Sequence, residues 1–161
     1  MPRIELEHRM RAPIERVFDL SLSVEVHVLS TKRTGERPVA GVTSGLMGPG
    51  DTVTWSAVHL GVRQQLTSEI HKYDRPTYFA DRQVRGAFAE FEHEHWFKMD
   101  GDVTVCKEVF DYRSPLGPLG KLVDWLFLES YMTRFLQVRA DTIKELVEGD
   151  GWKDYLPSQD G

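Results

Sequence analysis

The sequence contains almost no cysteine, and Cys106 is the only one among its 161 residues. A single thiol excludes a disulfide bond within the chain, and it leaves no cysteine pair to hold a metal ion or an iron–sulfur cluster. Such low cysteine use is typical of a reducing compartment, so we expect a cytoplasmic protein. Cys106 stands among apolar neighbours, where burial raises the pKa of a thiol and makes it unreactive.

Long apolar runs and an excess of positive charge are also missing. No run approaches the about 20 residues that span a membrane, so we expect no integral membrane segment. The first residues lack the apolar region of a signal peptide. The chain has 20 Lys and Arg against 25 Asp and Glu, and this net charge of -5 argues against nucleic acid as a partner. The 40% hydrophobic content is typical of one globular domain, whose oligomeric state the sequence leaves open.

Hydrophobic periodicity predicts one strand, two short helices, six strands and one long helix, in that order. The first strand alternates Ile4 and Leu6 with charged residues, and Pro13 and Ser23 mark the starts of the two short helices. The six later strands are expected at residues 37–42, 51–60, 62–73, 77–84, 87–99 and 103–113. We therefore predict an α+β fold, β-α-α-β(6)-α, with a curved seven-stranded antiparallel sheet wrapped around the last helix. Residues 1–149 form the domain, and residues 150–161 are expected to be a polar tail.

The last helix, expected at residues 118–148, carries an unusual charge. From Leu128 onward its apolar residues repeat at helical spacing, and the stripe is wide enough to lie across a sheet. The apolar residues before Leu128 point to a different side, so we expect a kink or a separate short helix near Phe127. Arg139 falls inside the stripe, where a guanidinium must meet a carboxylate, backbone carbonyls or water.

Three stretches of the chain resemble one protein superfamily. They are Gly50-Asp-Thr-Val-Thr-Trp55, Phe91-Glu-His-Glu-His95 and Tyr112-Arg-Ser-Pro-Leu-Gly-Pro-Leu-Gly120. Together with the order of elements, they resemble the helix-grip fold of the Bet v 1/START (SRPBCC) superfamily, and in particular its bacterial ligand-binding members. The resemblance implies an internal cavity for a hydrophobic small molecule or lipid, and no cofactor. It implies the fold more strongly than the function, because this fold hosts lipid carriers, hormone receptors, cyclases and oxygenase domains.

Strand parity predicts which side chains face the cavity, because residues of equal parity share one face of a strand. Glu90, Glu92 and Glu94 belong in water, so the odd residues of that strand point inward. By the same argument, the even residues of 103–113 and the odd residues of 51–60 are predicted to point inward. For 77–84 the sequence does not decide which residues point inward. The predicted ligand-binding residues are Trp55, His59, Phe91, His93, His95, Glu108, Phe110, Tyr112, Phe135 and Arg139.

Several roles for these residues remain open at this stage. Arg139 either pairs with Glu108 or holds an anionic group of the ligand in a wet cavity. Leu46 and Met47, in a glycine-rich loop, are predicted to gate the cavity mouth together with the start of the last helix. His93 and His95 share a face, and one more His or Glu could complete a zinc site. His-x-His on a strand is a weak signal, however, and no cysteine pair or His-Glu-x-x-His motif supports it, so we expect no metal ion.

Two other functions remain as alternatives to ligand binding, and we assign no catalytic residue. In the first, the protein is an enzyme of the polyketide cyclase/aromatase or dehydratase type. There His93 or His95 acts as general acid or base, and Arg139 or Tyr112 holds a carbonyl or carboxylate. In the second, it is a protein-interaction module. Its contacts are then the apolar residues before the kink or at the loop tip, namely Trp125, Phe127, Leu46 and Met47.

Overall fold

The computed structural model describes residues 2–157, apart from the side chains of residues 124 and 125. Its strands are β1 (Arg3–Met10), β2 (Arg37–Gly41), β3 (Thr52–His59), β4 (Val62–Asp74), β5 (Tyr78–Arg85), β6 (Glu90–Asp100) and β7 (Val103–Arg113). Its α-helices are α1 (Ile14–Ser21), α2 (Val24–Ser30), α3 (Gly117–Val123) and α4 (Glu129–Glu148). Shorter helical turns are η1 (Lys32–Thr34), η2 (Asp124–Leu128) and η3 (Gly151–Asp154). The predicted order of elements is confirmed.

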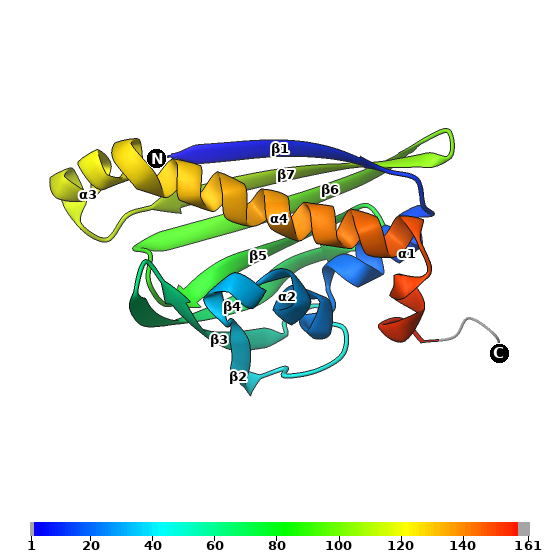
Figure 1. Ribbon diagram of the computed structural model, residues 1–161, viewed down its shortest axis with the longest axis horizontal. Helices are drawn as coiled ribbons and strands as arrows, with labels where there is room; N and C mark the ends of the chain where they lie inside the picture. The colour runs from blue at the N-terminus through cyan, green and yellow to red at the C-terminus, as the bar shows by residue number, and fades with distance from the viewer. Residues whose placement is uncertain (1, 158–161) are drawn as a thin grey trace.

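All seven strands join one antiparallel sheet, in the order β1-β7-β6-β5-β4-β3-β2. The N-terminal strand therefore pairs with the last one, and each other neighbour follows along the chain. Figure 1 shows α4 lying along one face of this curved sheet, with α1 near its C-terminal end and α2 beside its middle. This is the helix-grip arrangement that the sequence predicts.

The two short helices close one end of the space between sheet and α4. The predicted cap is present, because the Ser23 hydroxyl accepts a hydrogen bond from the Val26 amide at 3.2 Å and satisfies one free donor of α2. On α1, Phe18 is fully buried and meets three aromatic rings of β4, β5 and β6 edge-on. Such edge-to-face contacts fix the position of a ring as well as bury it, so α1 is held firmly over the sheet.

The last helix is interrupted where the sequence predicts a kink. Between α3 and α4, η2 is a π-helical turn, a common cause of sharp bends in helices. The bend allows α3 and α4 to present apolar residues in different directions. On α4, Leu136, Ala140, Ile143 and Val147 are buried against the core, one position away from the stripe that includes Phe135.

The last described residues fold back onto the domain. Trp152, Tyr155 and Leu156 are partly buried and pack against the main core. The Arg16 guanidinium lies 4.0 Å from the centre of the Trp152 ring and also donates to the Val147 carbonyl at 3.2 Å. The predicted tail thus contains a packed segment up to residue 157, while residues 158–161 lie outside the described part of the chain.

Candidate functional site

A cavity of about 310 Å³ lies between the sheet and α4. Aromatic and aliphatic side chains form most of its wall, and α1, α2, α4 and all strands from β3 to β7 contribute to it. Seven of the ten predicted ligand-binding residues line it: Trp55, His59, Phe91, His93, Phe110, Phe135 and Arg139. The parity argument for β3, β6 and β7 is therefore consistent with the observed facing of these strands.

The other three predicted residues lie behind the wall. His95, Glu108 and Tyr112 point to the same side of the sheet, but each is more than nine-tenths buried and none lines the cavity. His95 and Glu108 act on the cavity through His93, which does line it. Strand parity identifies the inward face but cannot separate the residues at the cavity surface from those packed beneath it.

Two hydrogen-bonded pairs, in contact with each other at one side of the cavity, form a group that we call the Glu36 cluster: His27, Glu36, His59 and Tyr131. Glu36 is 7% exposed and accepts from His27 Nε2 at 2.8 Å, and its second oxygen lies 4.0 Å from His59 Nε2. The other ring nitrogen of His59 is 2.7 Å from the Tyr131 hydroxyl. The cluster therefore places a hydrogen-bonding surface in an otherwise apolar cavity.

Burial and neighbouring charges shift the pKa values of the Glu36 cluster in opposite directions. Burial by itself would raise the pKa of Glu36, but the neighbouring His27, His59 and Arg139 hold that pKa below its ordinary value. Burial lowers the pKa of His59, and the Glu36 charge opposes that shift only in part. Glu36 is therefore a carboxylate and His59 a neutral imidazole at neutral pH.

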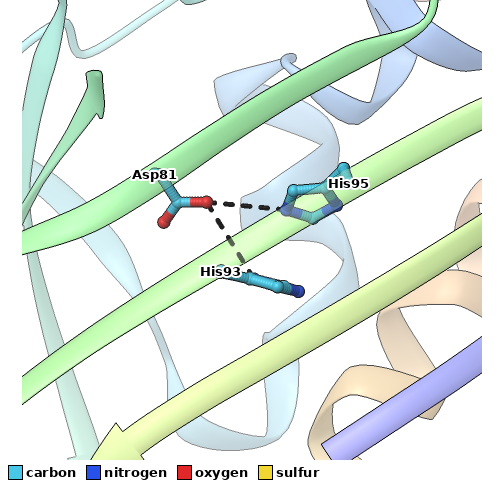
Figure 2. Close-up of side chains that lie close together, drawn as sticks. All are labelled: Asp81, His93 and His95. Atoms are coloured by element: carbon cyan, nitrogen blue, oxygen red, sulfur yellow. Dashed lines mark ion pairs between the residues drawn. The ribbon is translucent and has the colours of Figure 1, made fainter. Parts of the chain in front are cut away.

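A second group, the Asp81 cluster, joins three adjacent strands: Asp81 on β5, His93 and His95 on β6, and Glu108 on β7. In the sheet register, Asp81 is directly opposite His93, and His95 is directly opposite Glu108. Asp81 Oδ1 lies 3.5 Å from His95 Nε2 and 4.0 Å from His93 Nδ1, as Figure 2 shows. His93 Nε2 points the other way and lies 3.3 Å from Glu108 Oε2.

The buried charges of the Asp81 cluster also shift its pKa values. Burial lowers the pKa of His95 to about 4, and the adjacent His93 lowers it further. Burial by itself would raise the pKa of Asp81 and of Glu108, but the two histidines and Arg139 bring both pKa values below the ordinary range. Two carboxylates and a neutral His95 therefore lie close together at or behind the cavity wall.

Arg139 does not pair with Glu108, the first of its two predicted roles. Its Nη2 donates to the Ser21 carbonyl at 2.9 Å, its Nε is buried without a hydrogen bond, and Glu108 instead contacts His93. The Arg139 guanidinium nevertheless contributes, through its charge, to lowering the pKa of Glu36, Asp81 and Glu108. Because it also lines the cavity, its second predicted role, the anchor for an anionic group, remains open.

The sequence did not single out Asp81, Glu36, His27 or Tyr131. Asp81 lies on the strand whose facing stayed open, because polar and apolar residues occur at both parities there. Glu36 follows a turn and belongs to no periodic pattern, and Tyr131 was assigned to the apolar stripe of α4. The signal that was available is His27, which stands between Val26 and Val28 on a short helix.

The predicted gate needs a correction. Met47 is 8% exposed, belongs to the main core and donates its amide to the Leu22 carbonyl at 3.0 Å, so it is a packed wall residue. Leu46 is 38% exposed and does not line the cavity. The loop has partners that the sequence does not reveal, because the Gly45 amide also donates to the Glu25 carboxylate on α2 at 3.0 Å.

The most exposed residues of the cavity wall indicate where it opens. Leu60, at the turn between β3 and β4, is 68% exposed, and Leu116, just before α3, is 56% exposed. Leu116 comes directly before the start of the last helix, so we place the mouth beside that segment. Further exposed apolar side chains continue along α3 and η2, namely Leu119, Leu122, Leu126 and Phe127. This is the surface that the interaction-module alternative requires, while the side chain of Trp125 lies outside the described residues.

Comparison with solved structures finds the same fold in Bet v 1-like and START proteins. TTHA0849 from Thermus thermophilus is 21% identical, with a TM-score of 0.74 over 91% of this chain and 97% of that chain. Major latex-like protein 151 from Panax ginseng is 17% identical, with a TM-score of 0.64 over 97% and 98% of the two chains. A START superfamily protein from Mycobacterium smegmatis is 14% identical, with a TM-score of 0.66 over 91% and 97%.

At these identities the likeness shows the fold alone. No protein-family model matches the sequence, and no curated protein matches it. Within residues 2–157, none of the helices has both the length and the apolar character needed to cross a bilayer. The function must therefore be argued from the cavity and its clusters.

Proposed function

We propose that this chain, which shares the helix-grip fold of Bet v 1-like and START proteins, binds a hydrophobic small molecule or lipid for carriage or sensing. The observation that supports this most is the cavity itself, which is lined mainly by apolar side chains and contains a few convergent polar groups. Small-molecule sites generally have this composition, since apolar walls supply affinity and a few polar groups fix orientation.

The cavity also bears on the size of the ligand. Its volume of about 310 Å³ lies at the lower end of the range of about 300–1,000 Å³ that is common for small-molecule sites. This favours a compact molecule, such as a single short acyl chain or a few fused rings, over a lipid with two long chains. The ligand would place a hydrogen-bonding group near Arg139 or the Glu36 cluster.

Displacement of a neutral apolar fluorophore such as Nile red tests this proposal. Ala57 lines the cavity and is 4% exposed, so Ala57→Phe fills part of it and should weaken binding at least tenfold. The matched control is Val58→Phe, at the next position of β3 and 38% exposed, which should bind as the wild type does. Melting temperatures show whether Ala57→Phe remains folded, because overpacking costs about 1–3 kcal/mol.

If the wild type and Ala57→Phe bind Nile red equally well, the probe does not bind in the cavity. Native mass spectrometry of the protein purified from its source would then identify the class of any retained ligand, since apolar molecules survive purification in such cavities. A protein that carries nothing and binds no apolar probe would contradict the proposal.

One observation favours the enzyme alternative as a second candidate. His93 lines the cavity, and its two ring nitrogens face the carboxylates of Asp81 and Glu108, an arrangement suited to general acid–base catalysis. Turnover of a model β-hydroxy or β-keto thioester, lost in His93→Gln while Nile red still binds, would support this candidate. A wild-type protein without turnover on such substrates would count against it.

A further inference from the structure

Three potential metal ligands converge in the Asp81 cluster. One oxygen of Asp81 and one ring nitrogen each of His93 and His95 all lie within 4.8 Å of one another. Figure 2 shows Asp81 directed toward both imidazoles. Its separations of 3.5 Å and 4.0 Å from the two nitrogens are close to the about 3.3 Å between neighbouring ligands of a tetrahedral zinc ion, whose bonds are about 2.0–2.1 Å long.

We propose that Asp81, His93 and His95 bind one divalent transition-metal ion of the Zn²⁺ or Fe²⁺ class. Two imidazoles and one carboxylate are the donors that these ions accept when a coordination position is left for a water molecule or a ligand. Asp81 and His93 line the cavity, so that open position faces the space where the hydrophobic ligand would lie. The inference goes beyond the proposed function, because it assigns a second, inorganic ligand to the cavity.

Glu108 supplies a second argument that is independent of the three ligands. A histidine that binds a metal through one ring nitrogen usually donates its other N–H to a carboxylate, which fixes its tautomer and orientation. His93 is placed in this way, with Nδ1 toward Asp81 and Nε2 3.3 Å from Glu108 Oε2. With the proton on Nε2, on the side of Glu108, Nδ1 presents its lone pair to the metal.

The rings of the two histidines are held by their neighbours. His95 lies between Phe79, at 4.2 Å and 18° between ring planes, and His93, at 3.9 Å and 43°. His95 is 2% exposed and His93 is 6% exposed, so both rings have little freedom to move. Little conformational entropy is lost when such ligands bind an ion, and preorganisation of this kind favours binding.

The charges of the cluster also favour a cation. Asp81 and Glu108 are both largely enclosed, and among the described residues their ion-pair partners within 4.0 Å are the two histidines alone. An enclosed carboxylate needs a compensating charge, and an imidazole provides one only when it is protonated. A divalent ion would balance Asp81 directly and would polarise the His93 ring, whose Nε2 lies 3.3 Å from Glu108 Oε2.

The sequence argued against a metal because two histidines at His-x-His spacing on a strand are a weak signal and no metal-binding motif supports it. The third ligand comes from β5, the strand whose facing the sequence left open. The metal-free protein expected from the sequence remains an untested prediction. The position of Asp81 beside both histidines is the reason why we propose a metal site instead.

Metal titration of the chelator-treated protein tests the inference. Co²⁺ serves as a spectroscopic probe, since its visible absorption reports coordination geometry, and competition with a chromophoric chelator gives the affinity for Zn²⁺ and, without oxygen, for Fe²⁺. We expect one equivalent to bind and the melting temperature to rise with metal concentration. Asp81→Asn should weaken binding at least tenfold, and Glu108→Gln about 10–100-fold, the usual effect of losing a carboxylate behind a ligating histidine.

Two control variants separate this site from other histidines of the chain. His71 lies 3.1 Å from Glu92 on the outer side of the sheet, so His71→Gln should leave binding unchanged. His27→Gln removes a member of the Glu36 cluster and should also leave it unchanged. Loss of binding in either control with retention in Asp81→Asn would overturn the inference, and so would the absence of any metal-dependent rise in melting temperature.

If Asp81→Asn does not fold, nuclear magnetic resonance of the wild-type histidine rings decides instead. One equivalent of Zn²⁺ should shift the ring signals of His93 and His95 and leave those of His27 and His59 in place. The reverse pattern, or no shift at all, would contradict the assignment. Nile red binding is measured separately, so a failure of the metal site and a failure of the proposed function remain distinguishable.

Discussion

Arg139 on α4 donates from Nη2 to the backbone carbonyl of Ser21, at the C-terminal end of α1, at 2.9 Å. The last turn of a helix leaves carbonyl groups without partners inside the helix, and a guanidinium there satisfies one of them and complements the helix dipole. This bond connects the long helix to the short one across the end of the cavity. It also fixes a positive charge whose field lowers the pKa of Glu36, Asp81 and Glu108.

The first prediction concerns the partners of Arg139 and Glu108. Arg139→Leu should destabilise the fold by about 1.5–3 kcal/mol, the range for a hydrogen bond to a charged group. In urea unfolding, its coupling to Glu108→Gln should be smaller than the coupling between His93→Gln and Glu108→Gln, because only the second pair is in contact. A larger coupling to Arg139 would mean that the guanidinium and Glu108 pair directly.

The second prediction tests Arg139 as an anchor. Its Nε is buried without a hydrogen bond, so the guanidinium retains a donor for a ligand. Arg139→Leu should therefore weaken binding of an acidic apolar probe at least tenfold while a neutral probe such as Nile red binds as before. Calorimetric titration with a fatty acid and with the corresponding alcohol makes the comparison. Equal losses for both ligands would point to a change in cavity shape.

The third prediction concerns pH. Because the folded protein holds the pKa of Glu36 below its unfolded value, this carboxylate stabilises the fold above about pH 4.5, and the contribution is lost as pH falls further. Glu36→Gln should cost about 1.5–3 kcal/mol at pH 7, and its difference from the wild type should shrink below pH 4.5. It should also lower the pKa of His59 further, because Glu36 opposes the effect of burial.

Urea unfolding across pH, with nuclear magnetic resonance titration of His59, measures both effects. Glu90→Gln is the matched control, since Glu90 is exposed and its contact with Arg113 at 3.4 Å is a surface pair of small energetic value. A Glu36→Gln variant whose deficit stays constant from pH 7 to pH 3 would show that the carboxylate is not the group responsible.

The fourth prediction compares two adjacent residues of the glycine-rich loop. Met47 is buried in the main core, so Met47→Ala should lower the free energy of unfolding by about 2–5 kcal/mol. Leu46 is exposed, and Leu46→Ala should change it by about 0.5 kcal/mol or less. Thermal and urea unfolding of the two variants give the values. Similar losses for both would place Leu46 in the core as well.

The fifth prediction concerns the cavity mouth. Gly120 on α3 packs so closely on the preceding segment that a Cβ there would contact the Ser114 hydroxyl and lie 3.2 Å from the Leu116 Cβ. Gly120→Ala should therefore displace α3 from the mouth and raise the dissociation rate of a bound probe in stopped-flow measurements. Leu119→Ala, at an exposed neighbouring position, should leave the rate unchanged. Equal dissociation rates in the wild type and both variants would show that α3 does not control ligand exit.

The architecture could be predicted because it follows from patterns that repeat along the chain. On β6 the outward glutamates define one face, so the inward position of His93 and His95 follows from a period of two. The kink near Phe127 follows in the same way, because the apolar side of the last helix changes there. Both inferences need only local sequence.

The connections within the site could not be predicted, because they depend on how distant elements meet. Asp81 occupies an inward position that hydrophobicity alone would give to an apolar residue, and the neighbouring histidines on β6 and the charge of Arg139 favour its carboxylate there. Glu36 follows a turn and finds His27 across nine residues of chain. Arg139 meets a backbone carbonyl 118 residues away, and a carbonyl has no sequence signature.

The two edge strands of the sheet determine how easily the protein aggregates at high concentration. β2 is five residues long, contains Pro38, and shifts register between Pro38 and Ala40, so it cannot offer a continuous ladder to another chain. β1, the opposite edge, alternates buried residues with exposed charges such as Glu5 and Glu7. Both edges thus disfavour pairing with strands of other molecules, which is the step that leads to amyloid. The sheet can therefore enclose a cavity without promoting aggregation.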